Sequence, residues 1–162
     1  MQAAISGTLL LLLSGLVDPG PRLAWNVSSS APRGLYWISR GNEHSPGQFA
    51  AAWLGPQAAQ LAAQRHYLPR GIPIIKEVAA ATGDEVCASG HGIFLFGKII
   101  ATRLEADPEG RSMPWWSGCR RLGAGEVLLL NGRNPFSFDG RYFGPTPSSL
   151  VIGRAHLIWR RT

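Results

Sequence analysis

The chain has 162 residues, of which 16 are Lys or Arg and 10 are Asp or Glu, giving a formal net charge of +6. This length allows one domain with a hydrophobic core but not two full domains, and the 20 Gly, 12 Pro and 45% hydrophobic residues favour short strands and many turns over disorder. The arginines are scattered with no basic run longer than a pair, a pattern that disfavours a nucleic-acid partner and is equally compatible with attraction to anionic lipid headgroups.

The N-terminus is an apolar segment. Residues 3–17 (AAISGTLLLLLSGLV) carry no charge, and neither do Met1 and Gln2 before them. The length lies between the core of a signal peptide, about 7 to 15 residues, and a membrane-spanning helix of about 20. We therefore predict a signal-anchor or transmembrane segment over residues 1–20. Basic residues follow this segment and none precedes it, which alone favours a cytoplasmic C-terminal part; a buried core helix is the alternative.

The next segments carry strand and helix signals. Residues 34–39 (GLYWIS) and 48–54 (QFAAAWL) have the composition of strands. Residues 56–68 (PQAAQLAAQRHYL) predict a short helix with Pro56 near its start. Residues 72–87 (IPIIKEVAAATGDEVC) form an extended apolar run that a Thr-Gly-Asp turn interrupts.

The second half of the chain predicts further β structure. Residues 92–104 (GIFLFGKIIATRL) predict two strands around a Gly-Lys turn, and residues 103–122 predict a polar excursion. Residues 125–132 (GEVLLLNG) and 148–160 (SSLVIGRAHLIWR) predict two more strands, with residues 134–145 as a loop between them. The expected fold class is mainly β.

The cysteines are Cys87 and Cys119. No CxxC motif, His pair at ligand spacing or third soft ligand accompanies them, so we predict no metal site. In an extracytoplasmic protein they would form a disulfide that closes a small insertion over about residues 87–122 and stabilises the fold by about 3 to 4 kcal/mol. The alternative is two unpaired buried thiols in a cytoplasmic protein.

A lysine is the best candidate for a catalytic base. The four histidines have no adjacent serine motif and the chain has no GxSxG elbow, so a Ser-His triad is disfavoured. Alternation along an extended strand places Lys76 on the same face as Ile74 and Val78. Burial among aliphatic side chains lowers the pKa of a lysine and allows it to accept a proton. The alternative is that Lys76 lies at the surface. For Lys98, which follows the hairpin glycine, a surface position is the expected one.

Three segments resemble one family. The stretch NVSSSAPRGLYW (residues 26–37) is similar to the nucleophile motif of the conjugative-transfer signal peptidases, the TraF-type branch of the type I signal peptidases. Residues 72–86 resemble the family's lysine segment, and residues 134–145 (NPFSFDGRYFGP) resemble a third motif. These segments occur in family order over residues 24–159. Departures from the family pattern occur at Glu77, at Ala81-Thr82 and at Gly140.

The resemblance implies a signal-peptidase-like β catalytic domain over residues 24–162 that needs no cofactor. It places the nucleophile at Ser30 and the general base at Lys76. It also implies that the Ser30 backbone N–H and the Ser28 hydroxyl hold the oxyanion. The supporting residues carried over are Ser137, which would orient the lysine amine, and Asp139 and Arg141, which would brace the loop. A direct catalytic part for Asp139 is left open.

The implied function is that of a serine endopeptidase of the bacterial inner membrane, with its catalytic domain facing the periplasm. Its partners would be the membrane and a pilin-like precursor of a type IV secretion system, processed during conjugation by hydrolysis or by cyclisation. The alternatives are a general type I leader peptidase and a catalytically silent β module of a secretion complex. A self-cleaving repressor-like domain is disfavoured by the apolar N-terminus. Several aromatic residues could form an interfacial surface near the bilayer: Trp25, Tyr36, Trp37, Trp115 and Trp116.

Overall fold

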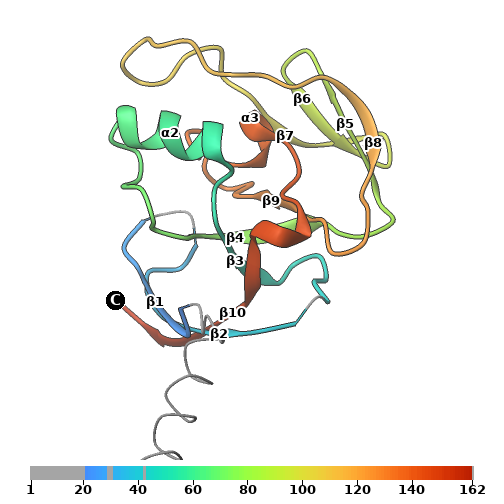
Figure 1. Ribbon diagram of the computed structural model, residues 1–162. Helices are drawn as coiled ribbons and strands as arrows, with labels where there is room; N and C mark the ends of the chain where they lie inside the picture. Colours follow the sequence, from blue (N-terminus) through green and yellow to red (C-terminus); the bar gives the residue numbers. More distant parts are fainter. Residues whose placement is uncertain (1–20, 29–30, 42, 162) are drawn as a thin grey trace, which may run out of the picture.

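The computed structural model describes residues 21–28, 31–41 and 43–161 (Figure 1). The anchor predicted over residues 1–20 lies outside this part of the chain. Within the described ranges no helix combines the length and the apolar character needed to cross a bilayer. The mainly β prediction is confirmed, because two antiparallel sheets form the body of the molecule.

The larger sheet has six strands in the order β1-β2-β10-β3-β4-β9. Its neighbouring strands are all antiparallel. Their bounds are β1 Leu23–Asn26, β2 Gly34–Ser39, β3 Phe49–Ala52, β4 Ile74–Ala80, β9 Leu128–Leu130 and β10 Val151–Arg160. Strand β10 is long enough to pair with both β2 and β3, which ties the C-terminal part of the chain to its beginning (Figure 1).

Two glycines allow β2 and β10 to approach closely. A Cβ added at Gly34 would lie 2.0 Å from the Trp159 carbonyl oxygen, and one at Gly153 would lie 2.2 Å from that of Ser39. Both distances are far inside van der Waals contact, and both glycines have positive φ angles. Any other residue at these two positions would force the strands apart.

The smaller sheet has four strands in the order β7-β6-β5-β8. They are β5 Glu85–Ser89, β6 Gly92–Leu95, β7 Lys98–Thr102 and β8 Gly118–Arg121. Cys87 and Cys119 lie opposite each other in β5 and β8 and form a disulfide, so this alternative to unpaired thiols is confirmed. The two cysteines are 32 residues apart in the sequence, so the disulfide links two distant segments of the chain. The sheet occupies the region where the insertion is predicted, at the upper right of Figure 1.

Short helices connect the strands. Helix α2 (Pro56–Gln64) begins with proline in its first turn and buries Ala58 and Ala62, which are one turn apart. It ends before the predicted residue 68 because His66 has a φ of 59°, outside the helical region. Helix α3 (Gly140–Phe143) and the 3-10 turn η1 (Ser148–Leu150) lie near the C-terminal end of the chain.

The core lies in three connected clusters. One packs β3, β4 and β9 around Val78 and Leu129, and another packs β2, β3 and β10 around Tyr36 and Ile38. The third joins Val86 and Ile93 of the smaller sheet to residues of β4 and β9. The two sheets therefore share one hydrophobic core, in agreement with the chain length.

Several sequence predictions need correction. Strands β1 and β8 were not predicted, because short segments such as LAWN and GCRR carry too few residues to show an alternation. The predicted loop 134–145 contains α3, whose start is capped by the Asp139 side chain. The hairpin turn between β6 and β7 consists of Phe96 and Gly97, both with positive φ, so that Lys98 already belongs to β7, where it is exposed.

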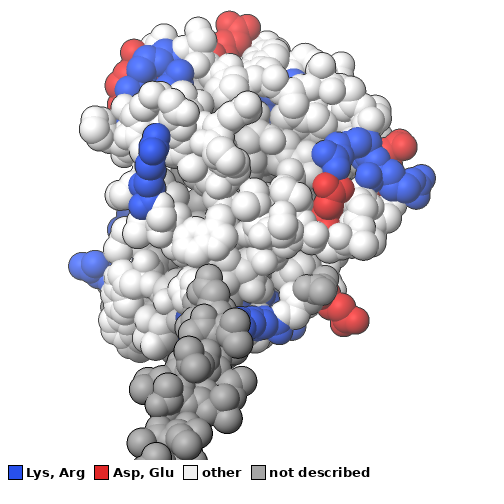
Figure 2. Space-filling model, in the orientation of Figure 1, with Lys and Arg blue, Asp and Glu red and all other residues white. Residues whose placement is uncertain are grey.

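The charged side chains on one face of the molecule are dispersed. On the face shown in Figure 2, Lys and Arg side chains form small separate groups with wide uncharged areas between them. The aromatic residues named from the sequence differ in exposure, and Trp116 is half-buried. Trp25, Trp37 and Trp115 are 41–48% exposed, whereas the Tyr36 side chain is fully buried in the core.

Candidate active site

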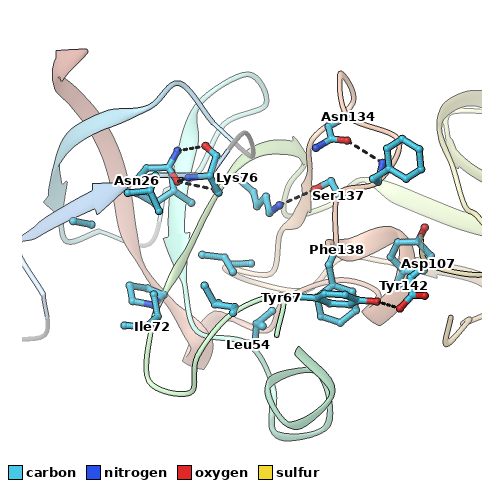
Figure 3. Close-up of a pocket in the computed structure, with 18 of the residues that line it drawn as sticks. Asn26, Leu54, Tyr67, Ile72, Lys76, Asp107, Asn134, Ser137, Phe138 and Tyr142 are labelled. Carbon is cyan, nitrogen blue, oxygen red and sulfur yellow. Dashed lines mark hydrogen bonds between the residues drawn. The ribbon is translucent and has the colours of Figure 1, made fainter. Parts of the chain in front are cut away.

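Lys76 lies in the middle of β4, between β3 and β9. It is 5% exposed, and its neighbour Glu77 points to solvent on the opposite face of the sheet, as strand alternation requires. The Lys76 amine donates a hydrogen bond to the Ser137 hydroxyl, with a Nζ–Oγ distance of 2.7 Å (Figure 3). Ser137 is itself 4% exposed, so the pair is screened from water.

Burial changes the acidity of this amine. Removal from water disfavours the ammonium form and is the main cause that lowers the pKa of Lys76 from 10.5 to about 8. The negative charge of Asp139 opposes this change and the positive charge of Arg141 adds to it. A substantial neutral fraction of the amine is therefore present near pH 7 to 8, and a neutral amine is able to accept a proton.

Asp139 and Arg141 hold the segment that carries Ser137. They are 0% and 2% exposed, and Arg141 Nε lies 2.8 Å from Asp139 Oδ1. The Asp139 carboxylate also accepts hydrogen bonds from the backbone N–H groups of Asn131 and Arg141. The Arg141 guanidinium donates to three carbonyl oxygens, those of Thr102, Asn131 and Pro135. This geometry is that of a brace that joins β7, the end of β9 and the loop before α3.

A pocket of about 500 Å³ opens beside Lys76. In Figure 3, Asn26 lies on one side of the lysine and Ser137 on the other. Most of the remaining wall is apolar. Its side chains come from β1, β4, the segments that flank α2, the loop between β7 and β8 and the loop before α3: Leu23, Leu54, Leu68, Ile72, Ile74, Leu104, Met113 and Phe138. Such a surface is suited to a chain segment with apolar side chains.

The predicted oxyanion residue Ser28 also lines this pocket. Its hydroxyl donates to Asn26 Oδ1 over 2.8 Å. The predicted nucleophile Ser30 and its neighbour Ser29 lie outside the described residues, whereas Ser28 and Ala31 on either side of them are described. The structure thus brings Lys76, Ser137 and Ser28 to one pocket from three distant parts of the sequence.

A second polar cluster on the pocket wall was not found from the sequence. The Asp107 carboxylate accepts hydrogen bonds from the Tyr67 hydroxyl and from Arg111 Nε, the latter over 2.6 Å, and pairs with Arg65 at 3.4 Å. Burial alone would raise the pKa of Asp107, but the hydrogen bonds from Tyr67 and Arg111 outweigh it and hold this pKa well below its usual range.

This cluster ties the loop between β7 and β8 to the end of α2. The signal available in the sequence was the turn motif DPEGR at residues 107–111, because an aspartate often accepts hydrogen bonds from the backbone two to four residues later. Asp107 does so from the N–H groups of Glu109 and Arg111. The contacts with Arg65 and Tyr67, some 40 residues away, had no signal in the sequence.

Metal ligands are not grouped in the part of the molecule that the structure describes. No set of three or more His, Cys, Asp or Glu side chains there is arranged to hold a metal ion.

Comparison with known proteins identifies the family of this chain. The family model described as "Signal peptidase, peptidase S26" matches residues 2–160. A plasmid transfer protein TraF of Escherichia coli is 36% identical, over 92% of this chain and 89% of the relative. A second TraF of that species is 34% identical over 88% and 84%, and a conjugal transfer protein TraF of Agrobacterium fabrum is 31% identical over 68% and 60%. The chain therefore belongs to the S26 signal peptidase family, among the TraF transfer proteins.

Proposed function

We propose that this chain is a membrane-anchored serine endopeptidase that processes an exported precursor protein during conjugative transfer, with Ser30 as nucleophile and Lys76 as general base. The observation that carries the proposal is the buried Lys76 amine, with its pKa lowered to about 8 and its position set by Ser137. This amine lies on a pocket that Ser28 also lines, two residues before Ser30 in the chain.

The proposed reaction proceeds through an acyl-enzyme. The Ser30 hydroxyl oxygen bonds to the carbonyl carbon of the scissile peptide while its proton passes to the neutral Lys76 amine. The tetrahedral intermediate then collapses: the C–N bond breaks, and the leaving amine takes the proton from the Lys76 ammonium. An ester between Ser30 and the substrate remains. Ser137 keeps the lysine amine in place through both proton transfers.

The developing negative charge needs donors. The Ser28 hydroxyl and the Ser30 backbone N–H are the proposed pair. Loss of one such donor in a serine peptidase lowers kcat by about 10² to 10³-fold.

The substrate is proposed to bind as an extended peptide. Strand β1 is at the edge of the larger sheet, and its residues Leu23 to Asn26 line the pocket. An edge strand offers backbone N–H and C=O groups to an incoming strand, and the apolar wall offers surface to alternate side chains. Both features favour a polypeptide substrate such as a pilin-like precursor.

The exposed aromatic surface supports a position at the membrane. Trp25 and Trp159 stack with ring centroids 5.3 Å apart, and both are about half exposed, as are Trp37 and Ile158 close by on β2 and β10. Arg160 and Arg161 lie at the end of β10 beside Trp159, whereas Arg22 precedes β1 at the other end of this group of strands. Tryptophan and arginine together are typical of the bilayer interface. We propose that this surface faces the periplasmic side of the inner membrane, with residues 1–20 as the anchor.

The acyl-enzyme permits two outcomes. Water attacking the ester releases a shortened linear product. An amine, such as the N-terminus of the same precursor, would instead form a new peptide bond and give a cyclic product that is lighter by one water molecule. Processing by either route is included in the proposal.

The test is intact-mass analysis of candidate precursors encoded beside this chain, co-expressed with the wild type, Ser30→Ala or Lys76→Ala. We expect a mass decrease with the wild type only, and a further loss of one water if cyclisation occurs. Ser89→Ala and Lys98→Ala are matched controls, because both residues are exposed and lie in the smaller sheet. Processing of the precursor by all four variants would refute the Ser30/Lys76 dyad. Normal conjugative transfer with folded Ser30→Ala and Lys76→Ala variants would favour the catalytically silent module. Cleavage of unrelated exported precursors would favour the general leader peptidase.

A further inference from the structure

Asn26 lies at the base of the hairpin loop that carries the predicted nucleophile. It is the last residue of β1 and is opposite Gly34, the first residue of β2. Residues 27–33 form the connection between these strands. Asn26 is 8% exposed, so its amide must find hydrogen-bond partners within the protein.

The two ends of this amide have different partners. Nδ2 lies 3.1, 3.0 and 3.2 Å from the carbonyl oxygens of Ser28, Ala31 and Pro32. Oδ1 accepts from Ser28 twice, from its backbone N–H at 3.2 Å and from its hydroxyl at 2.8 Å. The orientation of the amide is determined by these partners, because a flipped amide would face carbonyl oxygens with its oxygen and N–H donors with its nitrogen.

The same contacts join both sides of Ser30. Ser28 precedes Ser30 by two residues, and Ala31 follows it directly. One side chain therefore ties the two described flanks of the nucleophile to the end of β1. The Tyr36 hydroxyl adds a second tie, because it donates to the Pro32 carbonyl over 2.8 Å.

The Ser28 hydroxyl has a single proton, and in this structure that proton points to Asn26 Oδ1. It cannot donate at the same time to an oxyanion. The hydroxyl must therefore leave Asn26 when the tetrahedral intermediate forms, while the Ser28 N–H can stay on Oδ1 and keep the backbone in place.

We propose that Asn26 is a positioning residue for acylation: its amide holds both flanks of Ser30 and is the resting acceptor from which the Ser28 hydroxyl turns to the developing oxyanion. This inference rests on the proposed function. No proton is transferred in the step, because one O–H···O hydrogen bond is exchanged for another.

Two measurements on the full-length protein in detergent test it. The first needs no turnover: amide hydrogen exchange at Ser28 in the wild type and in Asn26→Ala. We expect exchange to be several-fold faster in the variant, because the acceptor of the Ser28 N–H is lost. Unchanged exchange would overturn the inference, whether or not the protein proves to be a peptidase.

The second measurement is kinetic and uses a synthetic peptide that spans the cleavage site of the processed precursor. Asn26→Ala is expected to lower kcat about 10²-fold, with KM within about twofold of the wild type, because misplacement affects the reacting groups and not substrate binding. The Asn26→Ala/Ser28→Ala double variant should lose much less than the product of the two single losses, because both act on the same hydroxyl.

Two further variants separate positioning from folding. Val86→Ala makes a cavity in the core of the smaller sheet and should lower stability without changing kcat at a temperature where the variant is folded. Asn26→Asp keeps an acceptor for Ser28 but loses the donors to the Ala31 and Pro32 carbonyls; we expect protected exchange at Ser28 with a lowered kcat. A kcat within twofold of the wild type in Asn26→Ala, or single losses that multiply in the double variant, would overturn the inference while leaving Ser30 and Lys76 in place.

Discussion

Lys76 and Asp107 line the same pocket, and both are almost completely buried, Lys76 at 5% exposure and the Asp107 side chain at 3%. Their surroundings differ. Lys76 donates to a neutral hydroxyl, that of Ser137, whereas Asp107 receives hydrogen bonds from two arginines and a tyrosine. The pKa of each group is lowered, but the consequences are opposite, because the lysine comes close to losing its charge near neutral pH and the aspartate keeps its charge.

The two buried groups differ in charge state because their hydrogen-bond partners differ. A buried charge is stabilised only where hydrogen-bond donors or opposite charges replace the lost water. Asp107 has them, and it joins α2 to the loop between β7 and β8. At Lys76 the Ser137 hydroxyl and the charge of Asp139 offset the burial only in part, which costs stability but produces an amine able to accept a proton.

Replacement of Lys76 by methionine should remove activity and increase stability. The loss of a general base is expected to lower kcat/KM by about 10³-fold or more. Because the folded-state pKa of about 8 lies below the unfolded value of 10.5, the ammonium destabilises the native state below pH 8, and this effect disappears as the pH rises from 8 to 10.5. The shift corresponds to about 3 kcal/mol.

Urea unfolding of wild type and Lys76→Met measures this effect. The variant should be more stable by up to about 3 kcal/mol at pH 7, and the difference should shrink towards pH 10.5. Lys98→Met is the control, because Lys98 is exposed and its replacement should leave both activity and stability nearly unchanged. A less stable Lys76→Met would show that the surroundings of Lys76 offset the burial of its charge in full.

The pH dependence of the wild-type reaction provides the second test. The neutral amine is the active form, so kcat/KM should rise about tenfold per pH unit below pH 8 and level off above it. A series of initial rates from pH 5.5 to 9.5 measures the profile. A rate that stays constant through this range would contradict the role of Lys76 as the base.

Ser137→Ala is the third test. The loss of its hydroxyl is expected to lower kcat about 10- to 100-fold, because the amine loses the group that orients it. The hydrogen bond favours the ammonium more than the neutral amine, so its removal should move the midpoint of the pH profile to lower pH. A fall in kcat with an unmoved midpoint would mean that Ser137 acts without affecting the charge of Lys76.

Asp107→Asn has the smallest expected effect on the reaction. The chemical step should keep its kcat, whereas KM should rise several-fold, because the loop that forms part of the pocket wall is held less firmly. Thermal unfolding should occur several degrees lower at pH 7. Since the folded-state pKa of Asp107 is depressed, its stabilisation is fully present above the ordinary value of 3.8. The difference from wild type should shrink as the pH falls from 3.8 through the lower folded-state pKa.

The matched control for this test is Glu109→Gln. Glu109 pairs with the other side of Arg111 but is exposed, so its charge contributes little. Equal effects of the two substitutions would show that the buried Asp107 charge contributes no more than the exposed Glu109 charge. The hydrogen bonds around Asp107 would then not explain how the loop is held.

The sequence by itself determined those features that depend on neighbouring residues. Alternation in residues 74–78 was sufficient to place Lys76 on the same face as Ile74 and Val78, because strand geometry turns successive residues to opposite faces. Proline at residue 56 marked the start of α2, and the serine, lysine and third motifs indicated the family.

Only the tertiary structure decided which distant groups meet. Ser137 contacts Lys76 across 61 residues, Asp107 contacts Tyr67 across 40, and the Asn26 amide is enclosed because β1 pairs with β2. Strand β1 and the capped helix α3 are likewise stable only in their surroundings, since four residues are too few to form a strand or helix alone. Local periodicity indicates which face of a strand a side chain occupies. The partner of that side chain across the pocket depends on how the sheets and loops pack, and packing depends on the whole chain.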